Sequence, residues 1–222
     1  MKTLCNVFGD VKVEVIQAVK DMVREGYYRK AEDERYSELS MLGAKMAGLY
    51  GISVPIGPMR HTGRGYGRYN PETTEIFTNK PSIVTFLHEF RHHMQAVITD
   101  LTIIGDGEPG SDLDAQAWAC SVFKKACPRM FAKAVAKGTI CGMIYRDGKL
   151  MNSDGSSEGI YPPADIREEL EQIVAQRRAR FEEMMAAASV TQIEDDDQGD
   201  QGVEGTYPVA FDTNEPYESG EE

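Results

Sequence analysis

The segment from Ile83 to Thr99 constrains the fold most, because it is the longest apolar helical pattern in the chain. It is I-V-T-F-L-H-E-F-R-H-H-M-Q-A-V-I-T and contains neither proline nor glycine. Pro81-Ser82 offers an N-terminal cap for it. Apolar residues cover much of its circumference, which is typical of a helix buried on several sides. The sequence therefore predicts a fold built around this helix.

Three of the four histidines in the chain lie on this helix, around one glutamate. His88, Glu89 and His92 form the pattern H-E-x-x-H, and residues i and i+4 share one helix face, so both imidazoles can bind one ion. Glu89 can reach a water on that ion and take its proton. Two core histidines satisfied by hydrogen bonds are the alternative, but burying these groups without compensation is costly. The pattern predicts a zinc site, with His93 in a structural role.

A catalytic zinc requires a third protein ligand. No histidine follows His93, so that ligand is an acid or a cysteine. Asp112 and Asp114 stand on a helix predicted to begin at a Ser111 cap, about twenty residues further on. Asp106 and Glu108 lie in the predicted intervening loop, which fixes a ligand less well. The residues alone leave Asp112 and Asp114 as the main candidates.

The segment D-L-D-A-Q-A-W-A (112–119) resembles the E-x-x-A-N/D-x-F-A helix of gluzincin-type zinc peptidases, particularly the ImmA/IrrE-like family. L-Y-G-I-S-V-P, a strand and H-E-F-R-H precede it in the order of that family, so the resemblance covers roughly residues 35–130. It implies that Asp112 is the third ligand and that Gln116 supports a ligand histidine. The family has Glu at the first position and L-L-M-P where this chain has K-A-C-P. Asp114 therefore stays open as the ligand.

The same resemblance implies where a substrate binds. The family places a strand edge beside the metal, where a peptide can add as a further strand. In this chain that edge would be Thr74 to Thr78. The sequence does not choose among four candidates for stabilising an oxyanion: Tyr145, His61, Tyr66 and Arg91.

The remaining patterns predict an α+β, zincin-like fold that is mainly helical, with a small antiparallel sheet beside the motif helix. Asp147-Gly148 is a strong hairpin turn signal, and Pro128 breaks or kinks the helix before it. Helices are expected over 10–25, 31–50, 112–126 and 164–188, with an extended segment over 52–59, a loop over 60–68 and a strand or hairpin ending at 75–78.

Charge divides the chain into two parts. Eleven acidic and no basic residues lie from Thr191 onward, which leaves about −1 of the net charge of −12 for the other 190 residues. We therefore expect a metallopeptidase domain over 1–190 and an acidic disordered tail over 191–222. The tail serves solubility or docks on a basic partner. A nucleic-acid partner is not expected, because three arginines on the 60–68 loop are the only basic cluster beside a nearly neutral body.

The expected compartment is the cytoplasm. The first residues lack the apolar run of a secretory signal, and no segment approaches the roughly 20 apolar residues of a membrane span. The four cysteines form no C-x-x-C pair, which fits reduced thiols.

The sequence thus predicts a zinc-dependent metallopeptidase that cleaves a protein or peptide substrate. His88, His92 and Asp112 would hold Zn²⁺, and Glu89 would activate the zinc-bound water. The alternative is a metal-binding regulatory or interaction protein on a zincin scaffold without significant catalysis. An intact Glu89 favours the first hypothesis, because a purely structural site does not need this acid.

Overall fold

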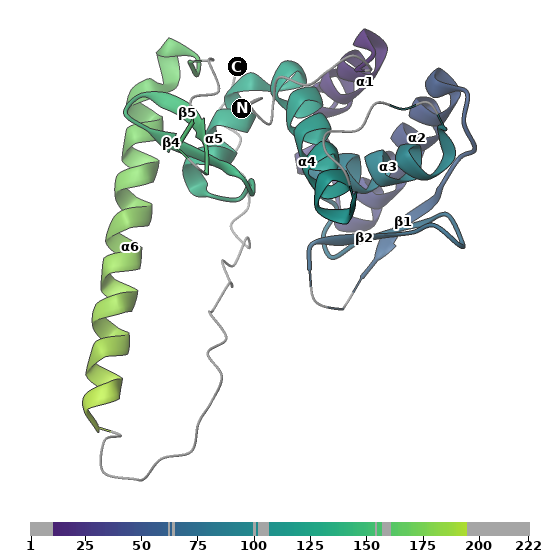
Figure 1. Ribbon diagram of the computed structural model, residues 1–222. Coiled ribbons are helices and arrows are strands. Elements are labelled where there is room, and N and C mark those ends of the chain that lie inside the picture. Colours follow the sequence, from purple (N-terminus) through teal and green to yellow (C-terminus); the bar gives the residue numbers. More distant parts are fainter. Residues whose placement is uncertain are drawn as a thin grey trace.

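The protein has an α+β fold in which helices predominate (Figure 1). The computed structural model describes residues 11–61, 63, 65–99, 101, 107–153, 155–156 and 161–194. The elements are α1 (Val13–Arg24), η1 (Tyr27–Arg29), α2 (Glu32–Tyr50), β1 (Ile56–Arg60), β2 (Gly67–Asn70), β3 (Glu75–Thr78), α3 (Ile83–Val97), α4 (Gly107–Ala126), α5 (Pro128–Lys137), β4 (Met143–Arg146), β5 (Lys149–Asn152), η2 (Ala164–Ile166) and α6 (Arg167–Glu194).

Helix α3 is the central element, as its apolar pattern predicts. The Ser82 side chain caps it by accepting a hydrogen bond from the backbone N–H of Thr85 at 3.3 Å. Helix α4 packs along one side of α3, and strands β2 and β3 pack on another. Phe86, Leu87 and Phe90 are fully buried between these layers. The motif helix is therefore held on several sides, which fixes the direction of its polar side chains.

The sheet beside α3 is mixed, so the prediction of an antiparallel sheet is only partly right. Its strand order is β1-β3-β2, with β1 parallel and β2 antiparallel to β3. The predicted substrate edge at Thr74 to Thr78 is wrong, because β3 has a neighbour on both sides. The open edge that packs near α3 belongs to β2. The chain inserts β3 between two strands that precede it, and local sequence patterns do not encode this order.

One predicted helix boundary, the beginning of α4, is wrong. Helix α4 begins at Gly107, before the predicted Ser111 cap, because Pro109 fits a first helical turn, where N–H groups lack partners anyway. Its end at Ala126 agrees with the prediction. The predicted break at Pro128 is confirmed, because Pro128 starts a separate helix, α5, at a position that proline favours. Strands β4 and β5 form the predicted hairpin across Asp147-Gly148.

Helix α6 extends away from the rest of the molecule (Figure 1). Ile166 and Leu170 are buried where it begins beside α5, whereas residues 175–188 are all exposed. The helix continues to Glu194, past the predicted end at 188. The tail predicted to be disordered lies outside the described part of the chain from Asp195 onward. None of the helices described is both long enough and apolar enough to span a membrane.

Candidate metal centre

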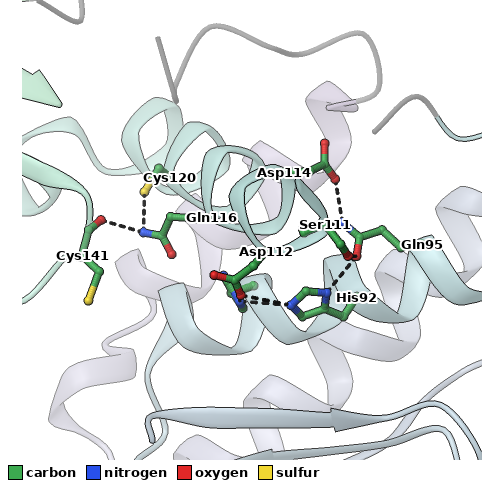
Figure 2. Close-up of polar contacts among 9 residues, drawn as sticks. His92, Gln95, Ser111, Asp112, Asp114, Gln116, Cys120 and Cys141 are labelled. Atoms are coloured by element: carbon green, nitrogen blue, oxygen red, sulfur yellow. Dashed lines mark hydrogen bonds and ion pairs between the residues drawn. The ribbon is translucent and has the colours of Figure 1, made fainter. Parts of the chain in front are cut away.

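Helices α3 and α4 bring His88, His92 and Asp112 together. Asp112 Oδ1 lies 3.1 Å from His88 Nε2 and 3.6 Å from His92 Nε2, and the two Nε2 atoms are 3.2 Å apart. Figure 2 shows His92 on α3 facing Asp112 on α4. The Asp112 side chain is 69% exposed and the histidines are mostly buried, which leaves the cluster open to solvent on the α4 side.

The spacing of these three atoms fits a metal ion. Zinc binds nitrogen and carboxylate oxygen at about 2.0–2.2 Å in tetrahedral geometry, which puts ligand atoms roughly 3.3–3.6 Å from one another. The observed separations of 3.1, 3.2 and 3.6 Å lie within this range or just below it. Two imidazoles and one carboxylate are also a donor set typical of catalytic zinc. The residues present therefore could hold a divalent ion.

The electrostatics around His88 favour the neutral ligand form. Burial lowers the pKa of His88 below its usual value, and the neighbouring His92 lowers it further, while Asp112 and Gln116 act in the opposite direction. A neutral imidazole is the form that binds a metal. Nδ1 of His88 is buried and has no hydrogen-bond partner in the described part of the chain.

Glu89 is buried beside the cluster, with 6% of its surface exposed. Burial, together with the nearby Asp112 carboxylate, raises the pKa of Glu89 to about 7, against a smaller lowering by a hydrogen bond from the Tyr69 backbone. A carboxyl group with a pKa near neutrality can both accept and return a proton, which a general base requires. Its placement agrees with the role predicted from the motif.

The β2 edge approaches Glu89 closely because residue 67 is glycine. A Cβ atom at Gly67 would lie 2.6 Å from Glu89 Oε1 and 2.8 Å from the Thr85 methyl carbon. The backbone N–H of Asn79 donates to the Tyr66 carbonyl, so Tyr66 and Asn79 are a hydrogen-bonded pair. Such pairs alternate with pairs that have no hydrogen bonds between them, and the next pair, Gly67 and Thr78, is of this second kind. The N–H and C=O of Gly67 therefore face the open edge of the sheet.

Replacing Gly67 by alanine is expected to destabilise the protein by about 1–3 kcal/mol, because the added methyl overlaps the buried side chain of Glu89 and the half-buried side chain of Thr85. The substitution must also displace the Glu89 carboxyl. Urea unfolding of the metal-free protein measures this cost. Gly48→Ala is the matched control: nothing lies within 4 Å of its added Cβ on helix α2, so it should stabilise by roughly 0.5–1 kcal/mol. A Gly67→Ala variant as stable as the wild type would show that β2 does not contact Glu89.

Asp114, the alternative ligand, is placed away from the cluster. It is 2% exposed and pairs with Arg91, whose Nε and Nη2 donate to its carboxylate at 2.7 and 3.2 Å. Arg91 also lies over the ring of Trp118, at 5.8 Å from its centroid. This pair occupies the Asp114 carboxylate, and it removes Arg91 from the oxyanion candidates because the guanidinium is buried behind the site.

Two residues of the site were missed in the sequence. Gln95 Oε1 lies 2.8 Å from His92 Nδ1, and the Ser111 hydroxyl donates to the same oxygen at 2.5 Å (Figure 2). The spacing of three residues between His92 and Gln95 on one helix is a signal that could have revealed the first contact. The second contact depends on how α4 packs against α3, which no local pattern shows.

Gln116 and His93 have supporting positions. The Gln116 amide donates to the Cys141 carbonyl at 3.0 Å, and its interaction with His88 raises the pKa of that imidazole. His93 is fully buried and points toward the sheet. Its Nε2 bonds to the Ser53 carbonyl at 2.8 Å, so Nδ1 accepts from the Tyr69 hydroxyl at 3.0 Å. His93 therefore links α3 to the neighbouring strand and loop.

The other oxyanion candidates have no described contact with His88, His92 or Asp112. Tyr145 is on β4, where the charges that affect its pKa are Glu171 and Arg167 of α6. The His61 ring packs edge-on against Phe77, and Tyr66 is 48% exposed just before β2. Of the weaker ligand candidates, Glu108 falls within α4 rather than in a loop, and Asp106 lies outside the described residues.

No family model matches the chain, and no curated protein or solved structure matches it either. Its function is therefore inferred from the geometry of the site.

Proposed function

We propose that this chain is a zinc-dependent metallopeptidase with a zincin-like fold. The observation that supports this proposal best is the convergence of His88, His92 and Asp112, whose ligand atoms all lie within 4.8 Å of one another. The buried Glu89 follows His88 directly on the same helix. A site that only binds metal has no need of an acid held in this position.

The roles follow from the chemistry of each group. His88, His92 and Asp112 hold the ion, which when bound supplies Lewis acidity and lowers the pKa of a water molecule to about 7. Glu89 takes a proton from the attacking water and returns it to the departing amine. In the metal-free protein, burial raises the pKa of Glu89 to about 7, so this carboxyl can be protonated near neutral pH. Peptide-bond hydrolysis needs both transfers.

The open edge of β2 offers a place for an extended substrate. The outward N–H and C=O of Gly67 can pair with the backbone of a peptide that adds as a further strand. Such a peptide would lie next to the Glu89 carboxyl, because Gly67 is so near to it that an added Cβ atom would lie 2.6 Å from Glu89 Oε1. Pairing through the backbone does not depend on the side chains of the peptide, so it suits peptides of many different sequences.

The proposal predicts one zinc ion per chain. Metal content of the purified protein is measured by mass spectrometry, and cleavage is followed with a mixture of quenched fluorescent peptides. His92→Ala should lose both zinc and cleavage, because a two-ligand site holds the ion poorly. His61→Ala is the matched control: this histidine packs on Phe77 and should retain the metal. A wild-type protein without stoichiometric zinc after gentle purification would contradict the proposal.

A further inference from the structure

Gln95 contacts both helices of the metal centre. Besides its contact with His92 on α3, its Nε2 donates to the Ser111 carbonyl at 2.9 Å and to Asp114 Oδ2 at 2.8 Å. The Ser111 hydroxyl returns a hydrogen bond to Gln95 Oε1. Figure 2 shows the Gln95 amide between His92 and the first described turns of α4. One side chain thus bonds to a ligand on one helix and to the residue beside a ligand on the other.

The chemistry of these partners fixes the orientation of the amide. A carbonyl and a carboxylate only accept hydrogen bonds, so they require the NH₂ group of Gln95. Its oxygen must then face His92 and the Ser111 hydroxyl, which both act as donors. His92 consequently carries its proton on Nδ1, and the lone pair of Nε2 points at His88 and Asp112. The tautomer of His92 is therefore set by a network that reaches α4.

The same amide joins α3 to the turn of α4 that carries Asp112. Asp112 has a mostly exposed side chain whose described contacts are with the two ligand histidines. Its neighbour Ser111 is held by two hydrogen bonds to Gln95, one from each end of the amide. The position of the Asp112 carboxylate therefore depends on the contact between Gln95 and Ser111.

We propose that Gln95 is the positioning residue that assembles the metal centre from its two helices. It holds His92 in the ligand tautomer and keeps Asp112 within reach of both histidines. This role rests on the proposed zinc site, and Gln95 itself does not bind the ion. The Arg91–Asp114 pair keeps its own two hydrogen bonds when Gln95 is changed. Replacing Gln95 should therefore disturb the site more than the fold.

The test compares Gln95→Met, which has similar length and no hydrogen-bonding amide, with the wild type. Zinc affinity is measured by competition with a chromophoric chelator, and it should fall about 10- to 100-fold. In the metal-free protein at pH 8, ¹⁵N NMR of the imidazoles should show that His92 shifts from the Nδ1–H form toward the Nε2–H form. Gln172→Met is the matched control, because this glutamine is exposed on α6, and it should leave the tautomer of His92 unchanged.

The outcomes separate this role from the proposed function. An unchanged zinc affinity or an unchanged His92 tautomer in Gln95→Met overturns the positioning role. Should Gln95→Met not fold, Gln95→Asn replaces it: the shorter amide cannot reach His92, and the same two changes are expected. Failure of the wild type to bind zinc would instead refute the proposed function, while the tautomer of His92 would still report on Gln95 in the metal-free protein.

Discussion

Glu89→Gln is expected to slow peptide cleavage by about 10²- to 10⁴-fold, the usual loss when a general base is removed. Zinc should remain bound, because Glu89 is next to the ligands and is not one of them. The fold should also remain intact. With a pKa raised to about 7 by burial, Glu89 is largely protonated in the metal-free protein below neutral pH, and glutamine imitates that uncharged form.

The measurement requires zinc content and cleavage rate in the same preparations. Glu72→Gln removes an exposed acid from the turn after β2 and should leave both quantities unchanged. Zinc retained together with a wild-type cleavage rate in Glu89→Gln would refute the hydrolytic mechanism. The protein would then be better described as a metal-binding regulator on the same scaffold.

Asp114→Ala is expected to lower the free energy of unfolding by about 3–5 kcal/mol, the usual cost of removing one partner from a buried ion pair. Both side chains of the Arg91–Asp114 pair are only 2% exposed. The substitution leaves the Arg91 guanidinium buried and without its carboxylate, and it removes an acceptor from Gln95. Asp114 does not reach the cluster, so its loss should lower the stability of the fold directly. Zinc binding should weaken only as a result of that lower stability.

Urea unfolding of the metal-free protein measures this effect without any contribution from a ligand. The control is Asp165→Ala, which breaks an ion pair with Arg129 in which both side chains are more than half exposed. Exposed pairs contribute only about 0–1 kcal/mol, so this variant should unfold almost like the wild type. Equal stability of Asp114→Ala and Asp165→Ala would show that the buried pair does not stabilise the fold.

The elements with strong local signals were predictable from the sequence. Helix α3 follows from an apolar pattern and a Ser82 cap, and the hairpin of β4 and β5 follows from Asp147-Gly148. The beginning of α4 was missed because Pro109 and the glycines on either side of it are typical of a loop. A first helical turn nevertheless tolerates them. The strand order β1-β3-β2 was missed because it depends on contacts between distant segments.

The candidate site also has a part that the sequence predicts and a part that only the packing of the helices determines. His88, Glu89 and His92 lie within one turn of one helix, so their spacing alone indicates a shared face. Asp112 and Asp114 are separated by about 200° around α4, and only the packing of α4 on α3 decides which of them faces the histidines. Gln95 could be found from its spacing to His92. Its hydrogen bonds to Ser111 and Asp114, through which it joins the two helices, could not be found from the sequence.

The length of α6 has an electrostatic consequence for the acidic end of the chain. Arg177 lies against Gly138, at the end of α5, and the helix then continues with exposed side chains to Met185 and beyond. At about 1.5 Å per residue, Glu194 lies roughly 25 Å further along the axis. Counterions at physiological ionic strength screen charges beyond about 8 Å. The acidic segment therefore begins some three screening lengths beyond the last contact of α6 with α5, so that the point at which it is attached lies outside the electrostatic range of the folded body.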